Sequence, residues 1–150
     1  MANLTKKQRQ AIHAKYDGPC AFCGKVIAYK EMQVDLMIPQ RRATYKAGKY
    51  RLPEESIENF ENYYPACRRC NHYKRAHSLE TFRRYIEEIP EKLAANYIYK
   101  VGSDYGLVEY HPKKIQFYFE KYEEIIDQLD IDNIQVCEIE DSDLLDMGVF

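Results

Sequence analysis

The sequence predicts a small α+β protein built around a metal-binding core. Three observations favour this class. Two Cys-x-x-Cys pairs lie far apart in the chain, short segments of alternating apolar residues lie near each pair, and other segments carry apolar residues at helical spacing. With 150 residues, the chain can form one modest core and an extension. We therefore expect short strands and helices around a single small core.

The first predicted helix runs from Thr5 to about Tyr16. Thr5 followed three residues later by Gln8 is a capping-box pattern, in which two side chains satisfy backbone amides at the start of a helix. The Asp-Gly-Pro sequence at 17–19 is a turn that ends this helix. The helix therefore leads directly into the first cysteine pair.

Short strands are expected on either side of a long loop. Partial alternation of apolar residues over 26–38 predicts a β-hairpin, and a polar, basic loop is expected over 40–58. A second short strand is expected at 63–66. A turn at 67–70 follows it, and a helix opens near Asn71.

The rest of the chain alternates between helical and strand patterns. Ser78 is the predicted N-cap of a helix that Pro90 ends, and a further helix is expected to end at Gly102. Alternating apolar residues predict a strand over 115–119. Helical spacing returns over 122–129.

The charge of the chain is unevenly distributed. The net charge is −2, but residues from Glu123 onward contain ten acidic residues and no lysine or arginine, which leaves +8 on residues 1–122. A basic body favours a polyanionic partner such as nucleic acid. No apolar run approaches the roughly 18 residues of a membrane span, and the N-terminus lacks a secretory pattern. A cytoplasmic protein is therefore expected.

The cysteine pairs give the clearest chemical prediction. Cys20 and Cys23 form one pair and Cys67 and Cys70 the other, with 43 residues between them. Four thiolates can complete the tetrahedral coordination of Zn²⁺, which predicts a structural zinc site with four cysteine ligands that joins two distant segments. Two alternatives are unrelated pairs of buried cysteines and a thioredoxin-like redox motif, although the redox motif needs only one pair.

Three segments around these cysteines resemble the zinc-containing HNH, or ββα-metal, endonucleases of phages and mobile elements. The first is Val-Asp-Leu-Met-Ile-Pro at 34–39, the second is an asparagine at 62, and the third is Cys-Arg-Arg-Cys-Asn-His-Tyr-Lys at 67–74. The family has Asp-His-x-x-Pro in the first segment. The resemblance covers about residues 5–90, and it is the combination and order of the motifs that make it specific.

The resemblance implies a ββα-metal core with flanking helices and a C-terminal α/β extension. It divides the chain into a nuclease-like domain over 1–90 and an extension over 91–150. It also implies that Asp35 and Asn71 bind one Mg²⁺ or Mn²⁺ through oxygen atoms, while Asn62 orders the loop beside them. Four basic residues are expected to contact phosphates: Arg68, Arg69, Lys74 and Arg75. Without the resemblance, Asp35 would be assigned as a solvated turn carboxylate and Asn71 as a helix N-cap.

Leu36 is the one clear departure from the family motif. It occupies the position of the histidine that takes a proton from the attacking water, and leucine cannot accept a proton. Loss of a general base typically costs about 10²- to 10⁴-fold in rate. His72 and His77 are the alternative bases, although His72 lies about 100° around the helix from Asn71 and His77 lies beyond the first turns of that helix.

Three functions follow from these patterns. The first is a metal-dependent HNH endonuclease that acts on double-stranded DNA and is strongly impaired or inactive because of Leu36. The second is a nuclease-derived, non-catalytic binding protein, such as a phage inhibitor of a host defence system or a regulatory DNA binder. The third is a zinc-containing interaction module without a nucleic-acid role. If the protein is phage-encoded, the bacterial host cytoplasm is its expected location.

The acidic segment 123–150 can be interpreted in two ways. Its many apolar residues favour a folded extension that packs on the core. Alternatively, its charge imitates that of DNA, and the segment covers the basic face or binds a basic protein partner.

Overall fold

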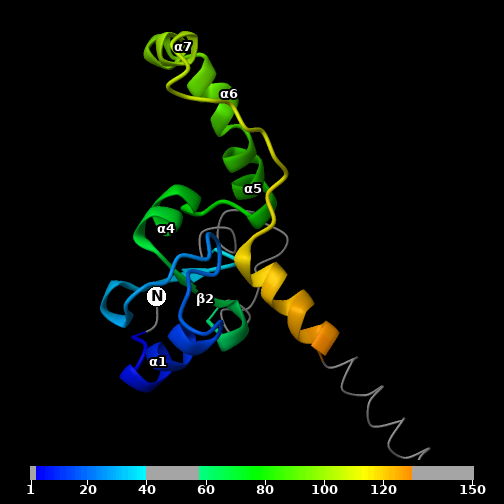
Figure 1. Ribbon diagram of the computed structural model, residues 1–150. Coiled ribbons are helices and arrows are strands. Elements are labelled where there is room, and N and C mark those ends of the chain that lie inside the picture. Colours follow the sequence, from blue (N-terminus) through cyan, green and yellow to red (C-terminus); the bar gives the residue numbers. More distant parts are fainter. Residues whose placement is uncertain (1–2, 40–57, 130–150) are drawn as a thin grey trace, which may run out of the picture.

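The computed structural model describes residues 3–39 and 58–129 (Figure 1). Within these ranges the chain combines helices with a two-stranded antiparallel sheet, which confirms the mixed helix-and-sheet class. The elements are α1 (Lys6–Ala14), η1 (Tyr29–Glu31), β1 (Gln33–Leu36), η2 (Phe60–Asn62), β2 (Tyr63–Ala66), α4 (Arg68–Lys74), α5 (Leu79–Glu87), α6 (Ile89–Ala94), α7 (Tyr97–Asp104) and a last helix over 118–129. The loop predicted over 40–58 lies outside the described residues except for its last position.

The sheet joins two segments that are far apart in the sequence. β1 pairs antiparallel with β2, so that Val34 faces Pro65 and Asp35 faces Tyr64. The strand predicted at 63–66 is confirmed, but the hairpin predicted over 26–38 is wrong, because residues 29–31 form a 3₁₀ turn and β1 pairs with β2 instead. The apolar alternation correctly indicated a strand at β1, but it carried no information about the partner.

Helices α1 and α4 flank this sheet. The capping box of α1 is confirmed by the hydrogen bond from the Gln8 amide to Thr5 Oγ1 at 3.3 Å and the bond from the Thr5 amide to Gln8 Oε1 at 2.8 Å. α4 begins at Arg68, earlier than predicted, because Cys67 is its N-cap and the sulfur of Cys67 accepts a hydrogen bond from the Cys70 amide. Asn71 therefore lies inside the helix, and its assignment as an N-cap is wrong.

Helices α5, α6 and α7 follow one another along an arm that leads away from the sheet (Figure 1). Ser78 caps α5 as predicted, and its hydroxyl accepts a hydrogen bond from the Thr81 amide at 3.2 Å. Pro90 lies in the first turn of α6, where its missing amide hydrogen costs little. The single helix predicted to end at Gly102 is wrong, because the Asn96 side chain caps a separate helix, α7, which includes Gly102.

The chain returns from the arm along α5 and rejoins the core. The Ile115 amide donates to Glu87 at 2.9 Å, and the Arg83 guanidinium donates to the Ile115 carbonyl at 2.6 Å. The strand predicted over 115–119 is wrong, because the Phe117 amide is capped by Glu120 at 2.8 Å and the last helix starts at residue 118. The alternating apolar residues are nevertheless buried, since Phe117 and Phe119 both belong to the core.

An aromatic cluster forms the centre of the molecule. Phe22 makes edge-to-face contacts with Phe82 and Phe117, whose rings stack on each other at 5.3 Å between centroids. These rings come from the first cysteine segment, from α5 and from the returning chain, so residues beyond position 90 belong to the same core as the sheet. Among the described residues, no helix is long and apolar enough to cross a membrane.

The position of Phe117 in this cluster gives a stability prediction. Phe117→Ala should lower the free energy of unfolding by about 3–5 kcal/mol, because it removes a fully buried ring and leaves a cavity. Leu107→Ala is the matched control, since Leu107 is 79% exposed. Urea unfolding followed by circular dichroism measures both. Equal effects of the two substitutions would contradict the burial of Phe117 in the aromatic cluster.

Candidate functional site

The four paired cysteines meet in one cluster. Their sulfur atoms all lie within 4.8 Å of one another, and the sulfurs of Cys23 and Cys67 are 3.9 Å apart. A tetrahedral Zn²⁺ with Zn–S bonds of about 2.3 Å requires sulfurs about 3.8 Å apart. The cluster can therefore hold a metal ion such as zinc with only small adjustments. Four thiolates leave no open coordination position, so the role of such an ion would be structural.

The backbone of the first pair forms a tight turn. The Gly24 amide donates to the Cys20 carbonyl at 2.9 Å, and the Cys20 amide donates to the Lys25 carbonyl at 2.8 Å. Gly24 has φ +74°, and a Cβ atom at this position would lie 2.9 Å from the ring of Tyr118. Glycine is therefore required here both by the backbone conformation and by the packing of the last helix.

The cysteine thiols influence one another's ionisation. A hydrogen bond from Cys70, with smaller contributions from backbone amides, lowers the pKa of the Cys20 thiol to about 5 against the opposing effect of burial. The same hydrogen bond raises the pKa of Cys70. Burial is the main reason why the pKa of Cys23 is raised. The cluster thus favours one thiolate, and the other protons must leave when a metal ion binds.

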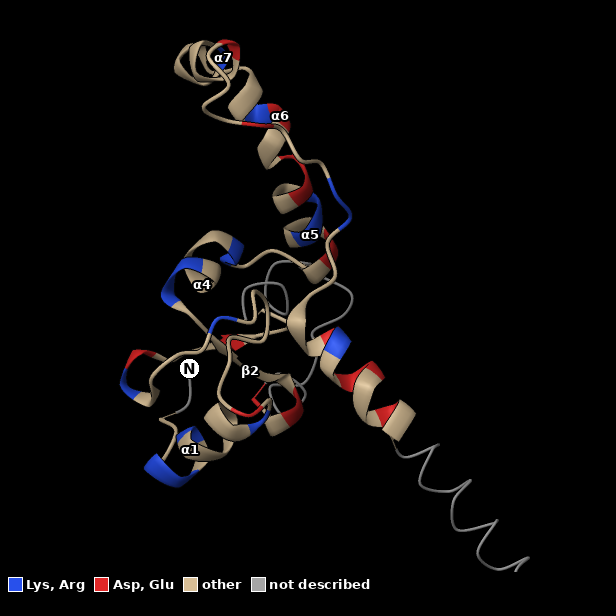
Figure 2. Ribbon diagram, viewed as in Figure 1, with Lys and Arg blue, Asp and Glu red and all other residues tan. Residues whose placement is uncertain are grey.

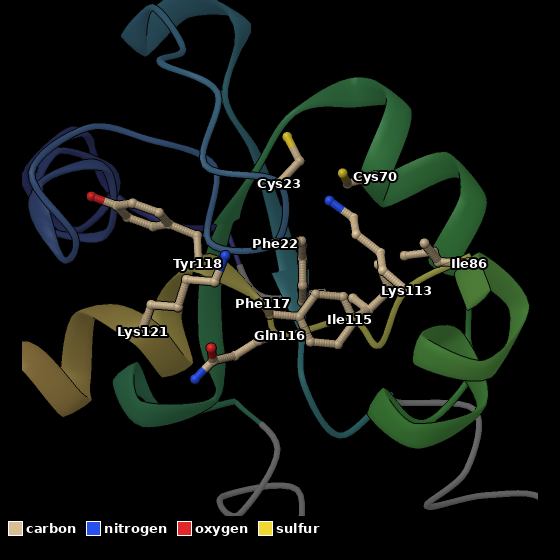
Figure 3. Close-up of a pocket in the computed structure, with 10 residues that line it drawn as sticks. All are labelled: Phe22, Cys23, Cys70, Ile86, Lys113, Ile115, Gln116, Phe117, Tyr118 and Lys121. Carbon is tan, nitrogen blue, oxygen red and sulfur yellow. The ribbon is translucent and has the colours of Figure 1, made fainter. Parts of the chain in front are cut away.

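A cavity of about 290 Å³ opens beside the cluster (Figure 3). Cys23 and Cys70 lie at one end of it, and Lys113 extends toward the same end. The rest of its lining is largely apolar and aromatic: Phe22, Ile86, Ile115, Gln116, Phe117, Tyr118 and Lys121. Lys113 therefore carries positive charge toward sulfurs that become negative when they ionise.

Asp35 and Lys74 form a buried ion pair between β1 and α4. The Lys74 ammonium lies 2.8 Å from Asp35 Oδ2 and donates a hydrogen bond to the Leu36 carbonyl at 3.0 Å. Lys74 is fully buried, and Asp35 is only 5% exposed. Burial raises the pKa of the Asp35 carboxyl, although the Lys74 ammonium opposes this shift. Asp35 is therefore not the solvated turn carboxylate considered from the sequence.

Asn62 contacts the loop that follows β1. Its side-chain oxygen accepts a hydrogen bond from the Ile38 amide at 2.7 Å, and its side-chain nitrogen donates to the Ile38 carbonyl at 3.1 Å. The Met37 amide adds a bond to the Asn62 carbonyl at 3.0 Å. The side chain of Asn62 therefore holds the loop immediately after Leu36 through both backbone polar groups of Ile38.

A second pocket, of about 620 Å³, brings several predicted site residues together. Its lining includes Asp35, Leu36, Asn71 and Arg75. Among the described residues, no histidine lines this pocket. His72 lines a different pocket, and the ring of His77 packs against Tyr85 at 4.9 Å between centroids. The geometry gives no support to either histidine as the alternative base considered from the sequence.

Two further residues of this pocket were not singled out in the sequence. Gln33 Oε1 accepts a hydrogen bond from the Asn71 side chain at 3.2 Å, and Arg9 donates to the Met32 carbonyl at 3.0 Å. Both line the pocket. Gln33 could have been found from its position two residues before Asp35, since residues i and i+2 of a strand share a face. Arg9 lies on α1, and no local pattern connects it to this pocket.

The four residues predicted to contact phosphates occupy different environments. Arg68, Arg69 and Arg75 are exposed on or next to α4, whereas Lys74 is enclosed with Asp35. Arg75 ends the helix with φ +50°, a value that residues with side chains rarely adopt. Figure 2 shows lysine and arginine gathered on α4, while acidic residues lie along the last helix. The acidic segment predicted over 123–150 is described only to residue 129, where it is helical.

Comparisons with known proteins found no match: no family model, no curated protein and no solved structure is significantly similar to this chain.

The geometry of the cluster predicts one tightly bound metal ion per chain. Protein purified with zinc should carry one zinc ion, and chelation should lower the melting temperature because binding free energy contributes to folding. Cys67→Ser should reduce the zinc content, whereas Cys137→Ser, at the cysteine outside the two pairs, should not. Native mass spectrometry and thermal melting measure these effects. Full zinc occupancy in Cys67→Ser would contradict the four-sulfur site.

The buried ion pair predicts a non-additive pair of substitutions. Lys74→Met should lower the free energy of unfolding by about 3–5 kcal/mol, because it leaves the Asp35 carboxylate buried without its partner. Adding Asp35→Asn should recover part of this loss, since the second substitution removes the unpaired charge. Denaturant unfolding of the two single variants and the double variant measures the coupling. Purely additive effects would show that the two groups do not interact.

Proposed function

We propose that this protein is a metal-dependent DNA endonuclease of the HNH type whose hydrolytic step is strongly weakened in this chain. The observation that carries the proposal is the arrangement of β1, β2 and α4, in which Asp35 and Asn71 line one pocket. The four-cysteine cluster lies at the start of α4, and Asn62 holds the loop that follows β1. Both features support the resemblance to the HNH endonucleases. The chemistry itself depends on the pocket.

The residues of the pocket fit a weakly held divalent ion. Asp35 offers a carboxylate and Asn71 an amide oxygen, and hard ions such as Mg²⁺ and Mn²⁺ prefer oxygen ligands. The Lys74 ammonium already offsets the charge of Asp35, which weakens its attraction for a cation. When bound, such an ion would supply Lewis-acid stabilisation of the phosphodiester and of the leaving oxygen.

The remaining residues define what the pocket can do. Arg9 and Arg75 line the pocket, and a guanidinium group can donate hydrogen bonds to phosphate oxygens. Asn62 keeps the loop after Leu36 in a fixed position. Leu36 itself is half-buried against the core and offers no group that can take a proton from water. Substrate positioning is thus available, whereas Leu36 cannot supply general-base catalysis.

A second candidate function is a nuclease-derived binding protein that has lost catalysis. Two observations favour it. Leu36 replaces the general base, and the ion pair between Lys74 and Asp35 balances the charge of the site without a metal ion. Such a protein would keep the nucleic-acid surface and act by binding, as a regulatory DNA binder or as an inhibitor of a host defence system. The two candidates differ in whether restoring the base restores cleavage.

Restoring the histidine provides the deciding experiment. Leu36→His should increase plasmid nicking in Mg²⁺ or Mn²⁺ by about 10²- to 10⁴-fold over the chain as it stands, because it supplies the missing base. Asp35→Ala in the same Leu36→His background should abolish the gain. Zinc content and circular dichroism should be measured first, so that inactivity is not mistaken for unfolding. A folded, zinc-containing Leu36→His protein that does not cut would favour the binding function.

A further inference from the structure

A third pocket, of about 820 Å³, adjoins the pocket of Asp35 at Gln33. Gln33 lines both pockets, so the two hollows meet at the start of β1. Four exposed cations line the third pocket: Lys25, Lys30, Arg68 and Arg69. Glu31 is the acidic residue in this lining. The resemblance drew attention to the two arginines, but not to the two lysines that share the pocket with them.

The lining of this pocket comes largely from the two cysteine segments. Lys25 lies two residues after Cys23 of the first pair, and Arg68 and Arg69 lie between the two cysteines of the second pair. The four-sulfur cluster brings these segments together, so it also sets the spacing of the cations that they carry. Three of its cysteines, Cys23, Cys67 and Cys70, contribute to the lining. The pocket is therefore held by the same junction that joins the two segments.

The charges of these residues are available for a ligand. Within the ranges 3–39 and 58–129, none of the four cations forms an ion pair with another described residue. By contrast, Arg84 and Lys92 on the arm and Lys114 on the returning chain each pair with a nearby glutamate. Several cations without an acidic partner around one hollow favour a ligand with several negative charges. The phosphate backbone of a nucleic acid has this pattern.

We propose that Lys25, Lys30, Arg68 and Arg69 form a phosphate-binding track for duplex DNA that leads past Gln33 to the pocket of Asp35. That the track leads to the pocket of Asp35 rests on the proposed function, in which hydrolysis would occur in that pocket. The track adds a surface that binds DNA phosphates other than the reacting phosphate. The track makes DNA affinity depend on several phosphate contacts and therefore on salt.

Equilibrium binding without cleavage tests the track. Fluorescence anisotropy of labelled duplex DNA is measured across about 50–200 mM salt, without Mg²⁺, Mn²⁺ or chelator, so that zinc is kept and the DNA stays intact. The double variant Lys25→Gln/Lys30→Gln should reduce the slope of log affinity against log salt by about 2 and weaken binding roughly tenfold or more. Lys92→Gln/Lys114→Gln, with the same net charge, should leave both unchanged. Glu31→Gln should strengthen binding.

The outcomes separate this proposal from the proposed function. Equal losses in the two double variants would overturn the track, because only net charge would then matter. Cleavage by Leu36→His with an unchanged salt slope in Lys25→Gln/Lys30→Gln would overturn the track and leave the nuclease proposal intact. Tighter binding of duplex RNA than of duplex DNA would overturn the assignment of the partner. A reduced slope in the lysine variant alone would support the track even if no variant cleaves.

Discussion

The four-cysteine cluster is the junction on which the rest of the structure depends. Cys67 directly follows β2 and caps α4, so the position of its sulfur fixes both the end of the strand and the start of the helix. Cys20 and Cys23 bring in the segment that carries Phe22 to the aromatic core. A sheet of two four-residue strands is too small to hold such distant segments together by itself. A metal ion at the cluster would provide the missing constraint.

The buried ion pair of Asp35 and Lys74 links this scaffold to the chemistry of the pocket. Taking two charges out of water is costly, and only good geometry and further hydrogen bonds offset that cost. Here the ammonium also bonds to the Leu36 carbonyl, so that it holds the end of β1 against α4. The contact between Lys74 and Asp35 also offsets the negative charge of the carboxylate, which a divalent ion would need as a ligand. The pair therefore connects β1 to α4, and it would weaken binding of the divalent ion that we propose for this pocket.

Two sets of cations in the described residues differ in their partners. On the arm and along the returning chain, cations such as Arg83 and Lys92 are paired with glutamates and hold neighbouring segments together. Around α4 and the first cysteine segment, the exposed cations have no such partners among the described residues. This separation explains how a chain with net charge −2 can still present a basic surface. The positions of the charged residues indicate the kind of partner better than the net charge does.

The sequence by itself determined the features that depend on local chemistry. The capping box at Thr5, the Ser78 cap, the β2 strand and the membership of the cysteine cluster follow from residue type and spacing over a few positions. Only the tertiary structure decided which segments pair. β1 joins β2 across a long intervening segment, Phe117 and Phe119 reach the core without forming a strand, and Lys74 is enclosed with Asp35. Each of these outcomes depends on contacts between residues that are distant along the chain. The local pattern of apolar and polar residues does not indicate such contacts.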